Sequence, residues 1–182
     1  MCQAYNEQYN TKFVSAMVTN LYGPNDNFNL ETAHVIPALI RKIHLAKLYE
    51  NNDFKSISHE LGIYSDINSI ELKLSELGIT KNTLTIFGDG ESIRDFLWSE
   101  DLVKSLLHIM NSEFNDEIIN VGTGTSTTIK EIVNILIKLI GYNGEILYNG
   151  KLKGTKDKTL DVTLLTKLGW ESTIKINEGL QK

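Results

Sequence analysis

Apolar and polar positions recur along this chain with two different periods, which predict both strands and helices. Short apolar or alternating runs predict strands at residues 13–20, 83–87, 93–97, 117–121 and 144–148. Apolar residues spaced by three and four positions predict helices at residues 34–49, from Ser99 onward, and at 129–140. Because strand and helix segments alternate, the sequence predicts an α/β fold.

Capping residues place the ends of several predicted helices. Ser99 is expected to cap a helix whose first turn is acidic, which suits the positive end of the helix dipole. Residues 128–131 (Thr-Ile-Lys-Glu) have the capping-box pattern, and Gly141 ends the helix that this box opens. Residues 21–27 are predicted to form the loop that leaves the first strand.

Residues 50–82 are polar and mixed in character, and they contain two helix-like stretches. These are predicted at residues 53–61 and 66–77, where Gly62 and Gly78 stop them. The segment carries enough apolar residues to form a small helical pair. We interpret this pair as a flap over a binding lobe or as an interface element.

A glycine-rich dinucleotide loop is not found in the sequence, because no G-x-G-x-x-G or G-x-x-G-x-x-G pattern follows a predicted strand. Gly122-Thr123-Gly124 precedes a predicted helix, but it lacks a third glycine and a following acidic strand end. A strand-to-helix turn is therefore favoured over a phosphate-binding loop.

Composition narrows the class of protein. The chain has 182 residues, of which 41% are hydrophobic and 23% charged, as in ordinary globular domains. A net charge of −5 argues against a nucleic-acid partner. Cys2 is the only cysteine, which excludes a disulfide within the chain and is typical of the cytoplasm. No apolar run approaches the roughly 18 residues of a membrane span, so we expect a cytoplasmic chain without membrane contact.

The first nine residues resemble the end of an amphipathic helix that has neither a lead-in nor a cap. A start inside a helix predicts a fragment of a longer protein. The alternative is a short native helix that frays.

Several segments together resemble the GDP-L-fucose synthases, within the extended short-chain dehydrogenase/reductases (NAD-dependent epimerases/dehydratases). The specific part is TNLYGPNDNF at residues 19–28 followed by HVIPALI at 34–40. The general part comprises FGDG at 87–90, RDFL at 94–97, SEDL at 99–102 and INVGTG at 119–124. The order and rough spacing follow the family along nearly all of the chain except residues 50–82, which are much shorter in relatives.

The resemblance implies a domain organisation. The chain corresponds to the C-terminal part of a Rossmann-like fold, mainly the smaller substrate-binding lobe. Residues 1–30 would form the end of the NADP-binding domain, and residues 31–182 the nucleotide-sugar lobe with an insertion at about 50–82. In the family, the glycine-rich NADP loop, the catalytic Ser and the Tyr-x-x-x-Lys pair precede the point that matches Met1. The isolated chain is therefore expected to be inactive.

The resemblance also assigns residues to the nicotinamide and the reacting sugar. His34 matches the histidine that faces both, and it would act as an acid during epimerisation, a role that suits imidazole. Val18, Thr19, Asn20 and Leu21 match the strand end and loop that pass the nicotinamide ring of NADP. From the residues alone, a helix-capping histidine and a turn asparagine are the alternatives.

Further residues match the substrate contacts of the family. Lys42 and Arg94 correspond to cations against the diphosphate, whereas a solvated helix face and a cross-strand ion pair are the alternatives. Phe87 stands where relatives carry Trp, so it can stack but lacks the indole N–H. Lys151 and Lys153 match a nucleotide-contacting loop with the pattern Lys-x-Asp-Gly, in which Lys153 replaces the acid.

The implied activity is NADPH-dependent conversion of a GDP-4-keto-6-deoxy sugar, by epimerisation at C3 and C5 and then reduction at C4. A GDP-6-deoxy-4-keto-heptose 4-reductase and a non-catalytic nucleotide-sugar-binding fragment are the alternatives, and a UDP-sugar 4-epimerase is less favoured. Because strands of this lobe would lack neighbours, we expect association with another copy, as a homodimer, or with an N-terminal part.

Overall fold

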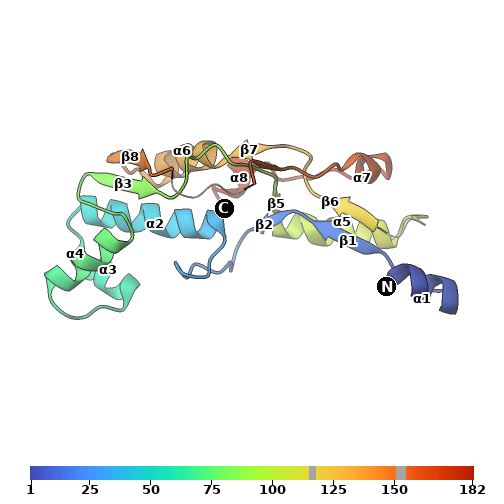
Figure 1. Ribbon diagram of the computed structural model, residues 1–182, viewed down its shortest axis with the longest axis horizontal. Helices are drawn as coiled ribbons and strands as arrows, with labels where there is room; N and C mark the ends of the chain where they lie inside the picture. The colour runs from blue at the N-terminus through green and yellow to red at the C-terminus, as the bar shows by residue number, and fades with distance from the viewer. Residues whose placement is uncertain (115–117, 151–154) are drawn as a thin grey trace. The chain divides into compact units, whose positions relative to one another are not determined.

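Helices and parallel strand pairs alternate along the chain, which confirms the α/β class (Figure 1). The computed structural model describes residues 1–114, 118–150 and 155–182. These residues form two compact units that interleave in the sequence. Unit 1 comprises residues 1–24, 93–127 and 157–182, and unit 2 comprises 25–92 and 128–156. The division at residue 30 that the family resemblance implies stays a prediction.

Unit 1 is built on two short parallel strand pairs. Strand β1 (Ser15–Val18) pairs with β6 (Ile118–Val121), and β2 (Asn20–Tyr22) pairs with β5 (Phe96–Trp98). The remaining elements are α1 (Cys2–Tyr9), β4 (Ile93–Arg94), α5 (Ser99–Met110), β9 (Asp157–Lys158), α7 (Thr163–Lys167) and α8 (Ile176–Gly179), with β7 (Thr127–Thr128) at the junction with unit 2.

The hydrophobic core of unit 1 lies between these strands and helices α5 and α7. It consists of seven buried side chains: Leu97, Ile109, Phe114, Ile119, Val121, Leu165 and Trp170. These residues come from β5, α5 and the segment after it, β6 and the segment around α7, so the core joins stretches that are distant in sequence.

A buried carboxylate fastens the C-terminal segment to unit 1. Asp101, in the first turn of α5, has no exposed surface. It accepts hydrogen bonds from the Thr173 amide at 2.7 Å, the Thr173 hydroxyl at 2.6 Å and the Ile174 amide at 2.9 Å, and Lys104 donates at 3.1 Å. Burial alone would raise the pKa of Asp101, but these hydrogen bonds outweigh it and lower the pKa.

Unit 2 packs helices around one long helix, α2 (Val35–Glu50), which contacts both α3 (Phe54–Leu61) and α6 (Ile129–Ile140). Helix α4 (Ile67–Glu76) packs on α3, and strands β3 (Thr83–Ile86) and β8 (Glu145–Tyr148) form a parallel pair (Figure 1). Helix α2 buries a broad face, because eight of its sixteen residues are buried.

The predicted capping box of α6 is confirmed, because Thr128 and Glu131 form it. At the start of α3, the Asp53 side chain also accepts a hydrogen bond from the Ser56 amide. The predicted helical pair at residues 50–82 is confirmed as α3 and α4. Ile57 and Leu74 are fully buried, so this pair forms part of the unit 2 core. Its role as a flap or interface element stays a prediction.

Two local predictions were wrong. Residues 21–22 belong to strand β2 (Asn20–Tyr22) rather than to a loop, because they pair with β5 and bury Tyr22 against Trp98, with ring centroids 5.4 Å apart. Ser99 does not cap α5: it is the first helical residue, and Trp98 occupies the cap position without a side-chain hydrogen bond. Tertiary pairing decided the first case and a shift of one residue the second.

Within residues 1–114, 118–150 and 155–182, no helix is long and apolar enough to cross a membrane. The same residues contain no group of three or more His, Cys, Asp or Glu side chains that could hold a metal ion.

The Asp101 contacts predict a large effect of Asp101→Asn. The asparagine keeps the shape but loses the charge and one acceptor, so the free energy of unfolding should fall by about 2–3 kcal/mol in chemical denaturation at pH 7. Because the folded pKa is lowered, this stabilisation is present above the ordinary value of 3.8 and is lost as pH falls through the folded pKa. The two proteins should therefore begin to converge in stability below pH 3.8 and converge fully only below the folded pKa of Asp101.

Asp161→Asn is the control, because Asp161 is exposed and its carboxylate accepts a hydrogen bond from the backbone amide of Thr163. It should cost well under half as much. An equal loss in both variants would contradict the role of Asp101.

Candidate functional site

The sequence-predicted site residues fall into two groups, each described within its own unit. Val18, Thr19, Asn20, Leu21 and Arg94 belong to unit 1, and His34, Lys42 and Phe87 belong to unit 2. Lys151 and Lys153 lie outside the described residues. The structure brings Lys42 and Phe87 into direct contact.

Lys42 is a buried cation in the middle of α2. Lys42 is only 7% exposed, and its Nζ donates a hydrogen bond of 2.6 Å to the Thr85 carbonyl of β3. Nζ also lies over the ring of Phe87, 4.2 Å from its centroid. The alternative of a solvated helix face is therefore wrong for Lys42.

Burial controls the charge of Lys42. It lowers the pKa of this lysine to about 8, because water no longer solvates the ammonium. The group is still mostly protonated at pH 7. A Thr85 carbonyl and an aromatic face are weak neutral partners for a full charge, so Lys42 remains well suited to bind an anion.

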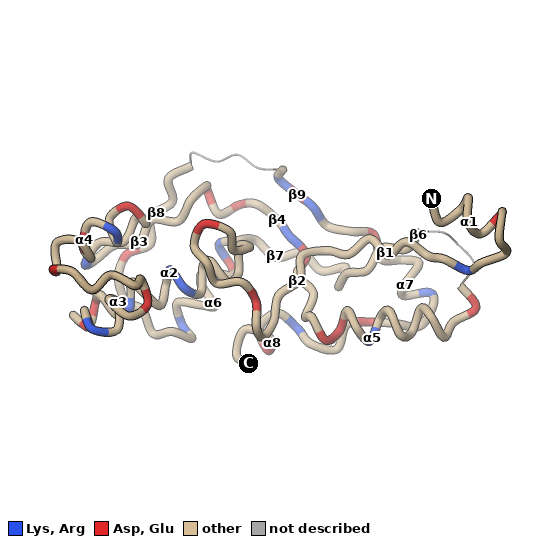
Figure 2. Tube along the Cα trace, turned by 90° about the horizontal axis from the view of Figure 1, so that it is seen from below, with Lys and Arg blue, Asp and Glu red and all other residues tan. Residues whose placement is uncertain are grey.

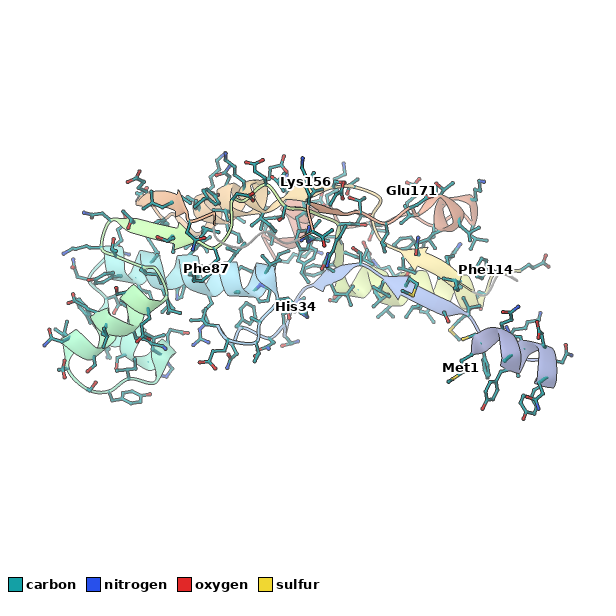
Figure 3. All side chains as sticks on the ribbon, viewed as in Figure 1. Met1, His34, Phe87, Phe114, Lys156 and Glu171 are labelled. Atoms are coloured by element: carbon teal, nitrogen blue, oxygen red, sulfur yellow. The ribbon has the colours of Figure 1, made fainter. Side chains whose placement is uncertain are left out.

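Phe87 borders an apolar cavity next to Lys42. It follows β3 and is 57% exposed, so its ring remains accessible to a stacking partner (Figure 3). The cavity has a volume of about 160 Å³ and is lined by Leu30, Val35, Ala38, Leu39, Lys42, Leu77, Ile86, Phe87 and Ile129. The cluster thus combines one cation, one open ring and an apolar pocket.

His34 is exposed at the start of α2 (Figure 3). It occupies the cap position of the helix, with extended backbone angles of −68° and 168°, but its imidazole makes no capping hydrogen bond. The alternative of a helix-capping histidine is therefore right about position and wrong about the side chain. Lys42 lies eight residues further, about 12 Å along the helix axis.

The segment from Val18 to Leu21 joins β1 to β2, and the Thr19 amide donates to the Val121 carbonyl at 3.0 Å. Two of its side chains also share one backbone carbonyl as acceptor. The Thr19 hydroxyl and the Asn20 amide both donate to the carbonyl of Asp95, at 3.0 and 2.9 Å. Val18 and Leu21 remain exposed, so apolar side chains flank this junction. Nicotinamide binding by these residues stays a prediction.

Asp95 is a site residue that sequence reasoning missed. It has no exposed surface, and its carboxylate accepts hydrogen bonds from the Thr123 amide at 3.0 Å and the Gly124 amide at 3.3 Å. Burial raises the pKa of Asp95, and these hydrogen bonds oppose the rise. The available signal was an acid directly before an apolar run, Phe96-Leu97-Trp98.

The contacts of Asp95 explain the turn at residues 122–124. A Cβ on Gly122 would lie 2.4 Å from the Asp95 carboxylate, so only glycine permits this approach. Because the turn directs its amides to a carboxylate of the protein itself, they are not available to a phosphate. The geometry supports a strand-to-helix turn and not a dinucleotide loop.

Arg94 lies on β4, which pairs in parallel with β9 so that Arg94 stands opposite Lys158 (Figure 2). Its Nη1 donates to the Ile93 carbonyl at 2.6 Å. The pKa of nearby Asp157 is lowered chiefly by hydrogen bonds from Thr159 and also by the charge of Arg94. A diphosphate contact of Arg94 stays a prediction.

Unit 1 also contains a larger cavity, of about 530 Å³, and none of the predicted site residues that the structure describes lines it. Its walls come from the turn around Thr123, from α7 and from the segment around Trp170 and Lys175.

Comparison with known proteins finds a family model and several relatives that match the chain. The model of the NAD dependent epimerase/dehydratase family matches residues 1–122. A GDP-L-fucose synthase of Sinorhizobium fredii is 36% identical over 183 residues, which cover 100% of this chain and 49% of the relative. The chain spans about half the length of the curated relatives it matches.

Two solved structures from Campylobacter jejuni have similar backbones. A GDP-6-OMe-4-keto-L-xylo-heptose reductase is 32% identical with a TM-score of 0.92, over 100% of this chain and 55% of that one. MlghC, a GDP-mannoheptose C4 reductase with NADP bound, is 32% identical with a TM-score of 0.87, over 100% and 54%. The described α/β arrangement is thus similar to that of about half of each of these two structures.

Asp95→Asn tests the anchoring of the turn at residues 122–124. The amide replaces one acceptor oxygen by a donor facing the Thr123 and Gly124 amides, so the free energy of unfolding should fall by about 2–3 kcal/mol. Hydrogen exchange at residues 122–125 should rise as well. Asp89→Asn is the control, because the exposed Asp89 accepts one amide bond, from Glu91. Unchanged exchange at the turn in Asp95→Asn would contradict the assignment.

Proposed function

Because the chain belongs to the NAD dependent epimerase/dehydratase family, we propose that it supplies the nucleotide-sugar-binding part of an NADPH-dependent epimerase and reductase that acts on a GDP-linked 4-keto-6-deoxy sugar. The observation that carries the proposal is the Lys42–Phe87 cluster, in which a buried ammonium lies over a half-open aromatic ring beside an apolar pocket. Such a cluster offers an anion contact and a stacking surface together.

In this proposal, Lys42 contacts the diphosphate and Phe87 stacks against the base or the sugar. The ammonium has only a carbonyl and a ring as partners in the described structure, so a phosphate oxygen would be its strongest partner. Arg94, Lys151 and Lys153 are proposed as further phosphate or ribose contacts.

His34 is the proposed acid of the epimerisation step. Its exposed imidazole is not committed to capping α2, so it can deliver a proton to the carbon that is inverted. NADPH, when bound, supplies the hydride that reduces C4. Val18, Asn20 and Leu21 fit the nicotinamide end of that cofactor, because they form an exposed junction of apolar and amide groups.

The phosphates of the cofactor require a different part of the protein. The amides of the turn at residues 122–124 donate hydrogen bonds to Asp95, so we propose no pyrophosphate contact there. The proposal therefore assigns the cofactor phosphates and the Tyr-x-x-x-Lys pair to the half of the relatives that this chain does not match.

A GDP-keto-heptose reductase is the second candidate. It is favoured by the TM-score of 0.92 with the GDP-6-OMe-4-keto-L-xylo-heptose reductase. The helical pair α3 and α4 also suits a site that must accept a larger sugar.

We also propose that unit 1 associates with another protein surface, and that the association is a homodimer. Helix α5 exposes an apolar stripe, which we call the α5 stripe: Val103, Leu106, Leu107 and Met110. Its spacing of three and four residues is that of a helix-packing face.

The Lys42 pKa predicts a pH-dependent affinity for GDP. Because Lys42 loses its proton near pH 8, the GDP affinity of the chain should fall by up to about tenfold between pH 7 and pH 9 in calorimetric titration. Lys42→Arg should remove most of that pH dependence, since a guanidinium keeps its charge. Lys42→Met should bind weakly at both values. Equal pH profiles in the parent and Lys42→Arg would sink the proposed diphosphate contact.

The division of labour predicts where reduction occurs. Loss of NADPH absorbance should be seen with a GDP-4-keto-6-deoxy sugar when the chain is joined to its cofactor-binding half, and not with the 182-residue chain alone. Reduction by the chain alone would overturn the assignment of hydride transfer. Turnover of the keto-heptose only would select the second candidate.

A further inference from the structure

Arg41 of α2 connects two parts of unit 2 that are separate in sequence. Its Nη1 donates to the Phe28 carbonyl at 3.0 Å, and its Nη2 donates to the Glu60 carbonyl at 2.6 Å. Among the described residues, the buried Nε has no hydrogen-bond partner. The planar fork of an arginine is the side chain that can reach two carbonyls at once in this way.

The first carbonyl belongs to the segment that leads into His34. Residues 27–33 are folded by asparagines: the Asn27 amide donates to the Thr32 hydroxyl, and the Asn29 side chain accepts from the Glu31 amide. Arg41 lies seven residues after His34, so both side chains lie on about the same face of α2. The bond to Phe28 therefore fixes this segment on the helix whose start carries His34.

The second carbonyl belongs to the last turn of α3, which ends at Leu61. Helix carbonyls there lack an amide four residues further on, and the negative end of the helix dipole favours a cation. Arg41 supplies both a donor and a charge to this end. The opposite end of α3 is capped by Asp53, and Ile57 is fully buried, so α3 is a well-anchored element.

We propose that Arg41 is a positioning residue that ties the segment 27–34 to the helical pair α3 and α4. The helical pair thereby sets how His34 is presented to the sugar, and it acts on specificity without touching the substrate. The link between the two elements is a property of unit 2 itself. Its consequence for the sugar rests on the proposed function.

Arg41 differs in this respect from its neighbour Lys42. Arg41 donates hydrogen bonds to two protein carbonyls, whereas Lys42 donates to one carbonyl and lies over the exposed ring of Phe87. Substitutions at the two positions should therefore separate loop order from ligand affinity.

The test is amide hydrogen exchange of the 182-residue chain and its variants. Arg41→Met should speed exchange at residues 27–34 and 61–64 by about tenfold or more, and Arg41→Lys should restore only one of the two segments, because an ammonium is a point charge without the fork. Lys47→Met is the matched control, since Lys47 on the same helix pairs only with Glu50 in the described structure. It should leave both segments unchanged.

Asp53→Ala provides an independent variant, because it loosens α3 at the end remote from Arg41. Faster exchange at residues 27–34 in this variant is expected, since the helical pair would no longer hold the segment through Arg41. Unchanged exchange at 27–34 in both Arg41→Met and Asp53→Ala would overturn the proposal. Complete restoration of both segments by Arg41→Lys would overturn the fork mechanism as well.

GDP affinity separates this proposal from the proposed function. Arg41→Met should bind GDP as the parent does, whereas Lys42→Met should bind it weakly. A loss of GDP affinity in Arg41→Met equal to that in Lys42→Met would mean that Arg41 is a ligand contact and not a positioning residue. Absence of GDP binding by the parent would count against the proposed function, while the exchange data would still decide the role of Arg41.

Discussion

Two buried carboxylates, Asp95 and Asp101, hold unit 1 together at either end of strand β5. The ladders β1–β6 and β2–β5 of this unit are short, so long connections must also be fixed by other means. Asp95 holds the turn at residues 122–124, and Asp101 holds the segment at 173–174. A carboxylate is costly to bury, and only several charge-assisted hydrogen bonds offset that cost. Each carboxylate therefore fixes the position of one loop. Because Asp95 and Asp101 flank β5, both loops are fixed relative to this short strand.

Unit 2 differs from unit 1, because apolar packing around α2 stabilises it, whereas its buried charge destabilises it. Lys42 is the costly group: a carbonyl and an aromatic ring compensate less of its desolvation than a carboxylate would. Burial lowers the pKa of Lys42 to about 8, which agrees with this incomplete compensation. A buried cation whose desolvation is only partly offset by protein contacts is stabilised most by a bound anion. This property makes the Lys42–Phe87 cluster suitable as a binding site. Arg41 already donates to two protein carbonyls, from Nη1 and Nη2, so it is better compensated than Lys42.

Local signals allowed much of the fold to be predicted from the sequence. The helices at 53–61 and 129–140 carry their own caps, Asp53 and the Thr128–Glu131 box, so their ends could be placed without tertiary information. Strand β2 could not, because three residues become a strand only through pairing with β5. The burial of Lys42 and the anchoring role of Asp95 depend on partners more than 25 residues away, Thr85 and Thr123. The candidate residues themselves came from family resemblance, and periodicity alone would have placed Lys42 in solvent.

The remaining exposed apolar surface constrains how unit 1 can exist. Helix α5 buries Ser105 and Ile109 on one face and exposes the α5 stripe on another, so it is apolar on more than one side. Strands β1 and β6 form a parallel pair that exposes Met17 and Ile118. Parallel strands are normally covered on both faces, and helices of this kind lie between two layers. Unit 1 therefore has the surface of an inner layer. The aqueous exposure of that surface opposes folding, and a covering layer of protein would convert the same side chains into stabilising contacts.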